Sequence, residues 1–418
     1  MCPDSPLALK AGQAAIVQDG DPRGWRERQV VKRLGRLQAG RLEVTLPSGS
    51  LAVFEGDNPG PTARLTIRSR RMVNRLFMAG SIGFAEGYMA NDWDCPDLPT
   101  LIYLLHLNED ALEPDFSRLQ YAYTLMSAVR HRLFRRNSRR GAKRNIAYHY
   151  DLGNDFYALW LDETWTYSSA LFAHPDEDLA TAQRRKYARL LERLAPESGD
   201  HILEIGCGWG GFARYAAEHT GCRVTGITLS EEQLSFARAR TREAGLDDRV
   251  QFELRDYRDV HESYDHVASI EMYEAVGEAY WPGYFRAIHD ALKPGGRAAI
   301  QAITISEDSF EYYRANVDFI QEYVFPGGML ASPTAFEHSA REQGLQTRER
   351  DFHGVDYART LMRWDTSVVK ARDAIVSERG ESFYRMWRYY LAYCAAGFTS
   401  GNIDLMQIAL ERPATKRA

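Results

Sequence analysis

The sequence predicts an α/β protein built on a doubly wound, mostly parallel β-sheet, with a smaller accessory domain before it. Three observations lead to this prediction. A short apolar strand at 201–205 runs into a glycine-rich turn and then into a helix. Apolar strands and helices alternate from residue 223 to residue 303. The chain has 418 residues, which exceeds the usual size of one hydrophobic core.

Composition and charge exclude several classes of protein. The chain is 44% hydrophobic and 26% charged, which is typical of a soluble globular protein. Its net charge of −5 gives no general attraction to nucleic acid. The five cysteines are scattered without a C-x-x-C pair, so we predict no metal site, no disulfide framework and a reducing cytoplasm. We expect neither a secretory signal nor a membrane-spanning segment, because no apolar run is long enough.

Residues 1–128 are predicted to form the accessory domain. Strands are expected at 41–46 and 51–54, joined by the hairpin signal Pro-Ser-Gly-Ser, and a third at 62–68. From residue 70 to residue 107 the pattern is mixed and predicts no single element. No catalytic constellation occurs in this part of the sequence.

A basic tract follows at 129–144, with eight Lys or Arg residues and no acidic residue. It allows three interpretations. It could be a solvated linker, or a contact with an anionic membrane into which Leu133 and Phe134 insert. It could also be a nucleic-acid-binding arm, although no motif supports that function.

The α/β core begins with the turn that contains Gly206, Gly208, Gly210 and Gly211. Glycine is required where the backbone takes a positive φ or approaches a ligand closely. The helix after this turn presents its N-terminus to the turn, which favours an anionic group there. Further strands are predicted at 223–228, 250–254, 264–270 and 298–303, and helices at 212–219, 230–244 and 279–292. Ligands of such a sheet bind at the carboxyl ends of the strands.

Two aromatic-rich segments flank this core, at 145–172 and 304–332. An amphipathic helix is predicted between the first segment and the core, at 181–194. After the second segment we expect helices at 335–344, 357–377 and 382–396, with strands at 345–351 and 403–410.

The ligand of the glycine-rich turn is indicated by the ends of the next strands. Dinucleotide-binding turns often place an acid near the end of the second strand. Here no acid occurs there before Glu231, whereas the third strand ends in Arg255-Asp256-Tyr257. A carboxylate and an aromatic ring could bind an adenine by hydrogen bonding and stacking. This pattern resembles S-adenosylmethionine-dependent methyltransferases more than dehydrogenases.

A closer resemblance rests on ten blocks in order: HYDLGNDFYALWLD (149–162), TYSSALF (166–172), LEIGCGWGGFARYAA (203–217), GITLSEEQ (226–233), RDYRD (255–259), SIEMYEAVG (269–277), LKPGGRAAIQAITI (292–305), DFIQEYVFPGGMLAS (318–332), YARTLMRW (357–364) and YYLAYCAAGF (389–398). They are similar to the cyclopropane-fatty-acyl-phospholipid synthase family, which includes mycolic acid cyclopropane synthases and fatty-acid C-methyltransferases. The resemblance covers about residues 145–412. Residues 1–140 match only loosely, as the N-terminal lipid-binding region of that family.

This resemblance implies a fold, an activity and a place in the cell. It implies a Rossmann-like class I methyltransferase domain at 145–418, a basic linker at 129–144 and a lipid-binding domain at 1–128. The family uses S-adenosylmethionine to join a methylene group across a cis double bond of an unsaturated phospholipid acyl chain, which gives cyclopropane fatty acids. The chain would then be cytoplasmic and peripheral at the anionic inner face of the membrane, would not bind nucleic acid, and would form a homodimer as members often do.

Such chemistry sets demands on the site. Methyl transfer to an alkene creates a carbocation in the acyl chain, so water must be excluded. Aromatic faces stabilise the positive charge. One positioned base must then remove a proton from the new methyl group. The aromatic segments at 148–172 and 312–325 fit these demands.

The resemblance assigns a cofactor-binding role to twelve residues, which are Tyr167, Ser168, Glu204, Gly206, Gly208, Gly210, Thr228, Leu229, Gln233, Asp256, Tyr257 and Ile270. In many members a bicarbonate ion is the base, held by a Cys, a Glu-His pair, a second His and a Tyr. The matching positions here are Ser169, Glu274, Ala275, Gln301 and Tyr323. Glu274 and Tyr323 match the family pattern, but the Cys and both His are absent.

These departures resemble the plant-type branch of the family, except for Ser169, which departs from that branch as well. The resemblance therefore implies Glu274, Tyr323, Ser169 and Gln301 as catalytic residues, with Glu271 as a second carboxylate nearby. Our hypothesis is that Glu274, held by Tyr323 and Gln301, either positions a bicarbonate ion or acts as the base itself.

Three other functions stay open. A fatty-acyl C-methyltransferase would give methylene- or methyl-branched chains from the same carbocation. A small-molecule methyltransferase, such as a coclaurine-like enzyme, would share the glycine-rich turn. A lipid-binding protein without catalytic activity would explain the missing Cys and His.

Overall fold

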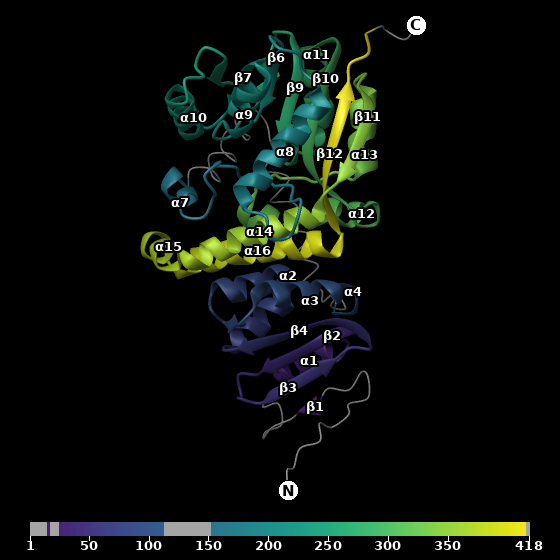
Figure 1. Ribbon diagram of the computed structural model, residues 1–418. Helices are drawn as coiled ribbons and strands as arrows, with labels where there is room; N and C mark the ends of the chain where they lie inside the picture. Colours follow the sequence, from purple (N-terminus) through teal and green to yellow (C-terminus); the bar gives the residue numbers. More distant parts are fainter. Residues whose placement is uncertain (1–14, 17–24, 113–151, 415–418) are drawn as a thin grey trace. The chain divides into compact units, whose positions relative to one another are not determined.

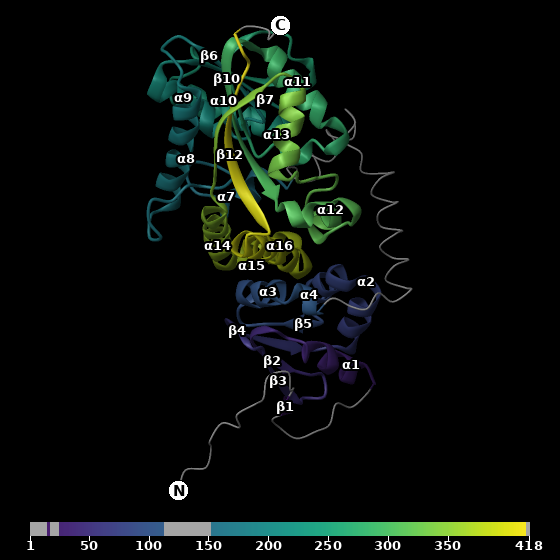
Figure 2. The same cartoon turned by 90° about the vertical axis from the view of Figure 1, so that its right-hand side faces the viewer.

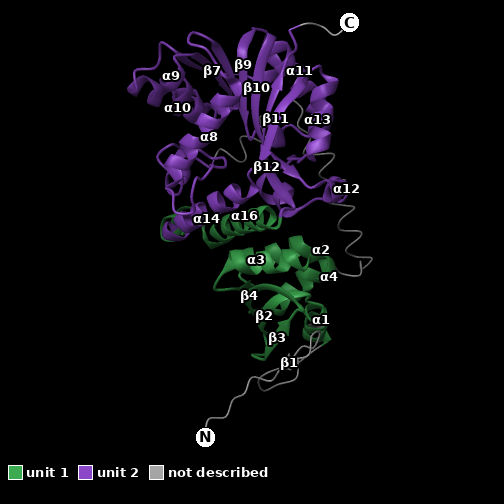
Figure 3. Cartoon of the chain, turned by 45° about the vertical axis from the view of Figure 1, so that its right-hand side comes forward, with its two compact units in different colours: residues 1–127, 372–400 green, residues 128–371, 401–418 purple. Residues whose placement is uncertain are grey.

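A computed structural model of the chain describes residues 15–16, 25–112 and 152–414. The chain forms two compact units (Figure 3). The first comprises residues 1–127 and 372–400, and the second comprises residues 128–371 and 401–418. The sequence placed residues 372–400 in the catalytic domain, whereas they pack with the first unit. The basic tract lies outside the described residues, so its three interpretations stay open.

The first unit contains a five-stranded sheet in the order β1-β3-β2-β4-β5. Its strands are β1 (Ala15–Ile16), β2 (Ala39–Thr45), β3 (Leu51–Glu55), β4 (Asn58–Ile67) and β5 (Trp93–Asp94). β2 and β3 form the predicted antiparallel hairpin, and β4 pairs with β2 in parallel. Alternate side chains of β2 are buried, which places Leu42 and Val44 in the core of this unit.

The first unit also contains six helices among the described residues. They are α1 (Trp25–Leu34), α2 (Arg70–Met89), α3 (Leu98–Leu107), α4 (Glu109–Leu112), α15 (Arg372–Arg379) and α16 (Glu381–Ser400). The mixed pattern of residues 70–107 contains α2 and α3. Gly80 interrupts α2 with φ 56° and ψ −130°, which breaks the helical periodicity of the sequence.

The C-terminal helix α16 belongs to the first unit through a buried arginine. Arg385 donates from Nε to the carbonyl oxygen of Tyr88 at 2.5 Å and from Nη2 to that of Trp93 at 2.8 Å. Its guanidinium carbon lies 3.8 Å from the centre of the Tyr88 ring. The sequence predicted one helix at 357–377, but the chain has two there, because α14 (Gly354–Lys370) ends before α15 begins.

The second unit is built on a seven-stranded sheet in the order β11-β12-β10-β9-β6-β7-β8. Its strands are β6 (His201–Ile205), β7 (Arg223–Thr228), β8 (Val250–Leu254), β9 (Tyr264–Ile270), β10 (Leu292–Ile305), β11 (Gln346–Phe352) and β12 (Ile403–Glu411). Five neighbouring strands of this sheet, β10, β9, β6, β7 and β8, are parallel to one another. β12 runs antiparallel to its neighbours β10 and β11. The predicted α/β fold with a mostly parallel sheet is therefore confirmed.

Helices lie on both faces of this sheet (Figures 1 and 2). On one face, α11 (Trp281–Ala291) and α13 (Pro333–Glu342) contribute to one hydrophobic cluster. On the other, α8 (Leu179–Leu194), α9 (Gly211–Thr220) and α10 (Glu231–Glu243) contribute to a second cluster. The buried, largely apolar strands between two helical layers explain the doubly wound arrangement.

The second unit also contains further helices and short helical turns, and Figure 1 labels α7, α12 and α14 among them. They include α7 (Asn154–Ala158), α12 (Glu307–Ala315), α14, the 3₁₀ turns η1 (Tyr257–Asp259), η2 (Tyr273–Ala275) and η3 (Glu278–Tyr280), and the π-helical turn η4 (Ile320–Val324). The two aromatic-rich segments of the sequence contribute α7, α12 and η4. Within the described residues, no helix is both long and apolar enough to cross a membrane.

Candidate active site

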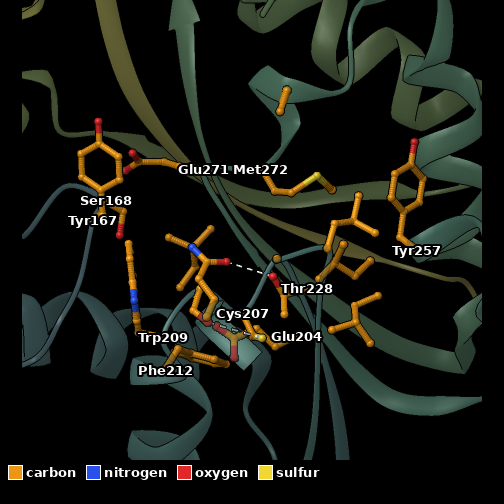
Figure 4. Close-up of a pocket in the computed structure, with 18 of the residues that line it drawn as sticks. Tyr167, Ser168, Glu204, Cys207, Trp209, Phe212, Thr228, Tyr257, Glu271 and Met272 are labelled. Atoms are coloured by element: carbon orange, nitrogen blue, oxygen red, sulfur yellow. Dashed lines mark hydrogen bonds between the residues drawn. The ribbon is translucent and has the colours of Figure 1, made fainter. Parts of the chain in front are cut away.

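A pocket opens at the carboxyl ends of β6, β7, β8 and β9, the edge where a doubly wound sheet binds its ligands (Figure 4). All the predicted cofactor residues except Gly210 line it, namely Tyr167, Ser168, Glu204, Gly206, Gly208, Thr228, Leu229, Gln233, Asp256, Tyr257 and Ile270. The structure thus brings together residues that are spread over about a hundred positions of the sequence.

The glycine-rich turn has the conformation that the sequence predicts. Gly206, Gly208 and Gly210 have φ of 81°, 51° and 81°. A Cβ at Gly208 would meet nothing within 4 Å, whereas at Gly210 it would lie 2.7 Å from Cζ of Phe252. Gly208 therefore keeps space open in the pocket, and Gly210 instead allows close packing of the turn against β8.

The ends of β7 and β8 present polar groups to the pocket. Thr228 donates from Oγ1 to Oε1 of Gln233 at 2.9 Å, which fixes the side-chain amide (Figure 4). The carboxylate of Asp256 accepts two hydrogen bonds from the guanidinium of Arg258, at 2.5 and 2.8 Å. Burial raises the pKa of Tyr257 to about 12, so its phenol is neutral.

Aromatic rings form one wall of the pocket. Tyr167 packs against Tyr157, Trp160 and Trp364, with ring centres 5.3 to 5.5 Å apart. Trp209, in the glycine-rich turn, donates from Nε1 to Oδ1 of Asn154 at 2.7 Å. The segment at 148–172 thus contributes to the pocket, whereas no residue of 312–325 lines it.

The predicted catalytic residues separate into two groups. Glu274 and Tyr323 do not line the pocket. Oε1 of Glu274 accepts a hydrogen bond from the backbone N–H of Ile303, and its buried Oε2 has no hydrogen-bond partner among the described residues. Burial, with the nearby Glu271, raises the pKa of Glu274 to about 8. Tyr323 lies on η4, with its ring centre 5.5 Å from that of Phe319.

Ser169 and Gln301 meet instead at Glu271, which does line the pocket. Oε1 of Glu271 accepts hydrogen bonds from the backbone N–H of Ser169 and from Nε2 of Gln301, both at 2.8 Å. Oε2 accepts one from the hydroxyl of Tyr357 at 2.5 Å. The expectation that Gln301 holds Glu274 is therefore wrong in this structure, because its amide is directed to the other carboxylate.

A fully buried lysine stands behind the pocket. Lys186, on α8, donates from Nζ to Oγ of Ser168 at 2.7 Å and lies 4.7 Å from the centre of the Tyr187 ring. Burial lowers its pKa to about 8, although the acids Glu271, Asp162 and Glu204 favour its charged form. One buried cation, Lys186, thus lies next to the pocket and interacts with three acids.

Glu204 is the buried acid beneath the glycine-rich turn. Burial raises the pKa of its carboxyl well above the ordinary value, and Lys186 opposes that rise. Oε2 of Glu204 is buried without a hydrogen-bond partner among the described residues. Since this residue lines the pocket, its free oxygen is available to a polar group of a ligand.

Sequence reasoning gave Glu271 no catalytic role and missed Lys186 and Tyr357. Glu271 could have been found from its position immediately after the apolar strand β9, where parallel strands deliver functional side chains. Lys186 could have been found from its place four residues before the core residue Leu190 on an amphipathic helix. Tyr357 is the first residue of the block at 357–364, but nothing in the sequence shows that a helix so far along the chain reaches this carboxylate.

A sequence model of the family described as "Mycolic acid cyclopropane synthetase" matches residues 137–408. The chain is 39% identical over 392 residues to "Tuberculostearic acid methyltransferase UfaA1" of Mycobacterium tuberculosis, with 92% of this chain and 91% of that protein covered. It is 33% identical over 356 residues to the cyclopropane-fatty-acyl-phospholipid synthase of Escherichia coli K12, with 85% and 89% covered.

Solved structures also resemble this chain. The crystal structure of mycolic acid cyclopropane synthase CmaA1, complexed with SAH and CTAB, superimposes with a TM-score of 0.61 and 29% sequence identity. The match covers 64% of this chain and 98% of the other chain. The predicted Rossmann-like class I methyltransferase fold is thereby confirmed.

Proposed function

The chain belongs to the mycolic acid cyclopropane synthetase family and is an S-adenosylmethionine-dependent methyltransferase, and we propose that it transfers the methyl carbon to the cis double bond of unsaturated phospholipid acyl chains to form cyclopropane fatty acids. The observation that carries this proposal is the composition of one pocket. A glycine-rich turn for the cofactor meets aromatic rings and a buried carboxylate in the same cavity (Figure 4).

The residues of the pocket fit S-adenosylmethionine. Gly208 leaves open space above the turn, and Oε2 of Glu204 is buried and available to a polar group. In our proposal Glu204 and the turn hold the polar end of the cofactor, while Asp256 and Tyr257 hold its adenosine. S-adenosylmethionine supplies an electrophilic methyl carbon, and the electron pair of its broken C–S bond stays on the sulfur.

The aromatic wall suits an alkene substrate. Tyr167 and Trp209 line the pocket. In our proposal they keep water away and offer π faces that stabilise a cation in the acyl chain. In the view of Figure 4, Glu271 and Tyr167 both lie on the side of the pocket opposite to Tyr257. An anionic group is thus available where positive charge would develop. A nucleophilic amine or hydroxyl substrate would not require these walls.

A second candidate function is methyl branching. The carbocation could lose its proton after a hydride shift, which would give a methylene branch that a partner reductase could reduce. The observation in its favour is the 39% identity to a relative named as a tuberculostearic acid methyltransferase. Ring and branch differ in one respect that can be measured, since a methylene branch takes up hydrogen under mild catalytic hydrogenation and a cyclopropane resists it.

The predicted partners are part of this proposal. An anionic membrane surface would present the phospholipid, with the protein peripheral at the inner face and forming a homodimer. The basic tract at 129–144 supports membrane contact through its eight positive charges. Sedimentation with vesicles of anionic phospholipid, compared with neutral vesicles, tests that contact directly.

The predicted roles of Glu274 and Tyr323 also stay proposals. Glu274 carries a buried oxygen without a partner among the described residues, which supports a role close to the site. A Glu274→Gln variant that retains full activity would remove Glu274 from the mechanism.

The test of the function uses the full chain with S-adenosylmethionine and vesicles whose acyl chains carry one cis double bond. We expect fatty acids that are heavier by one CH₂ group and that resist mild hydrogenation. Vesicles with saturated chains are the control and should give no product.

S-adenosylmethionine binding by calorimetry, without any change in the unsaturated chains, would contradict a lipid substrate. It would favour the small-molecule methyltransferase, whereas failure to bind the cofactor would favour a lipid-binding protein without catalytic activity.

A further inference from the structure

The donors that would hold a catalytic anion are directed to a carboxylate of the chain itself. Ser169 and Gln301 occupy two of the positions that hold bicarbonate in relatives, and both donate to Glu271 in this structure. We propose that Glu271 replaces the bicarbonate ion as the proton acceptor of the reaction, so that the enzyme works without bicarbonate. This inference rests on the proposed function, since it names the base of that reaction.

The Glu271 carboxylate is held by three donors and keeps one direction free. The N–H of Ser169 and Nε2 of Gln301 bind Oε1, and the hydroxyl of Tyr357 binds Oε2. A carboxylate offers about four lone-pair directions, so one remains for a proton. The side chain lines the pocket. Lys186, the cation that acts on it, donates to Oγ of Ser168 instead.

The orientation of Gln301 is fixed by a further contact. Its Oε1 accepts a hydrogen bond from Nε2 of Gln407 at 2.8 Å, so Nε2 of Gln301 must face Glu271. Gln301 and Gln407 are both fully buried. The pair therefore forms a chain of oriented amides that ends on the Glu271 carboxylate. Gln301 acts as a positioning residue.

The same site fits a bicarbonate ion poorly. The hydroxyl of Ser169 donates to the carbonyl oxygen of Ala170 at 3.0 Å, and Ala275 has no polar side-chain atom. A bound anion would also lie close to Glu271, where two negative charges oppose each other. At the positions that hold the ion in relatives, the residues of this chain are thus better suited to hold the carboxylate of Glu271.

The backbone of Glu271 is held in a conformation that few glutamates adopt. Its φ is 49°, in the left-handed region, and its N–H donates to the carbonyl oxygen of Gln301 at 2.8 Å. Such a conformation costs about 1 kcal/mol or more and persists where surrounding contacts determine it, often at functional sites. It turns the side chain at the end of β9 toward Ser169 and Tyr357.

The electrostatic surroundings set the ionisation of this carboxylate. The charged or titratable groups that act on Glu271 are Lys186 on α8, Tyr357 on α14 and Glu274 on η2. Burial raises the pKa of Glu271, whereas Lys186 and the three hydrogen bonds lower it. A base with a raised pKa is better matched to removing a proton near neutral pH.

In the proposed step, the Glu271 carboxylate forms an O–H bond with a proton of the newly added methyl group. The electron pair of the broken C–H bond closes the ring on the neighbouring cationic carbon of the acyl chain. The acyl chain loses its positive charge, and Glu271 becomes a neutral carboxylic acid that then returns its proton to solvent. No oxidant or reductant is needed.

The first experiment measures the dependence on bicarbonate. The wild-type enzyme is assayed with unsaturated phospholipid vesicles in decarbonated buffer and again with added bicarbonate. We expect equal rates, within about twofold. A wild-type enzyme that loses about tenfold or more of its rate on removal of bicarbonate would overturn the inference, while its lipid product would leave the proposed function intact.

The second experiment uses Glu271→Gln and Glu271→Ala. We expect the Gln variant to lose about 100-fold or more of its rate, which is the usual contribution of a general base. The Ala variant should regain at least about tenfold when bicarbonate or formate is added, because a small anion can enter the space of the lost carboxylate. A merely structural residue would not show that rescue. Retained S-adenosylmethionine binding by calorimetry shows that both variants are folded.

The matched control is Glu243→Gln, an exposed glutamate at the end of α10, which should keep the wild-type rate. A fully active Glu271→Gln enzyme would overturn the inference and leave the function standing. A wild-type enzyme that gives no lipid product under either condition would overturn the proposed function itself, so the two failures are distinguishable.

Discussion

At the scale of single residues, the pocket depends on a group of buried charges that share one cation. Lys186 is fully buried and interacts with Glu204, Glu271 and Asp162. Burial of a charge is unfavourable unless it is paired and hydrogen-bonded, so the lysine and the acids stabilise each other. Lys186 also fixes the hydroxyl of Ser168, which lines the pocket.

We expect Lys186→Met to move the acid limb of the pH–rate profile to higher pH. Lys186 lowers the pKa of Glu271, so its loss raises that pKa and fewer molecules carry the ionised base at neutral pH. The rate at about pH 7 should fall about tenfold and recover partly at higher pH. Arg185→Met, on the same helix but exposed, should keep the wild-type profile. A uniform loss of rate at every pH would contradict this account.

Glu274 should make stability depend on pH. Its pKa in the folded chain is about 8, above the ordinary 4.5, so its contribution to stability is complete below about 4.5 and is lost as the pH rises through 8. Glu274→Gln cannot ionise. We expect the urea midpoint of the wild type to fall between about pH 5 and pH 8.5 more steeply than that of the variant. Parallel pH dependences would show that Glu274 is not held as a buried neutral acid.

At the scale of elements, two glycines in the turn between β6 and α9 have different roles. Gly208 faces open space in the pocket, and Gly210 faces Phe252 and Ala237 of the packed interior. Both have positive φ, so any other residue carries a backbone cost of about 1 kcal/mol. The two positions therefore differ only in the space that is available for a side chain.

We expect Gly208→Ala to weaken S-adenosylmethionine binding about tenfold or more, with a loss of stability close to the backbone cost alone. Gly210→Ala should lower the free energy of unfolding by about 2 to 3 kcal/mol more, because its methyl group meets Phe252. Calorimetric titration and urea denaturation of both variants measure the two effects. Equal cofactor affinity of the Gly208 variant and the wild type would contradict the placing of the cofactor at this turn.

The sequence predicted the regular elements of the second unit well because local pattern determines them. The strand, turn and helix at 201–220 follow from apolar periodicity and glycine spacing, and they place the glycine-rich turn at the pocket. The partners of Glu271 could not be predicted in this way. Gln301 and Tyr357 reach it from β10 and α14, and only tertiary packing decides which of two nearby carboxylates they contact.

At the scale of the whole molecule, the division into units does not follow the order of the chain. Residues 372–400 leave the second unit and complete the first, where α16 packs on α2 and α3. The sequence could not reveal this, because α14 to α16 form one nearly continuous run of helical pattern. The first unit is thus built from the N-terminal part of the chain and one helical segment that precedes the last strand.

The contact of Arg385 should be important for the first unit. Arg385→Met leaves the carbonyl oxygens of Tyr88 and Trp93 without this donor in a buried site. We expect the free energy of unfolding to fall by about 3 kcal/mol, from two lost buried hydrogen bonds. Arg64→Met, whose side chain is 71% exposed, is the control and should change it by less than about 1 kcal/mol. A similar effect of both variants would contradict the packing of α16 in this unit.

The central claim is that the chain alkylates a lipid double bond and that a proton then leaves the new methyl group. The most direct test uses S-adenosylmethionine with three deuterium atoms on its methyl group, unsaturated phospholipid vesicles and mass spectrometry of the fatty acids. The account predicts products that retain two of the three deuterium atoms and have lost the original double bond. Products that retain all three deuterium atoms, or label found only outside the acyl chains, would contradict it.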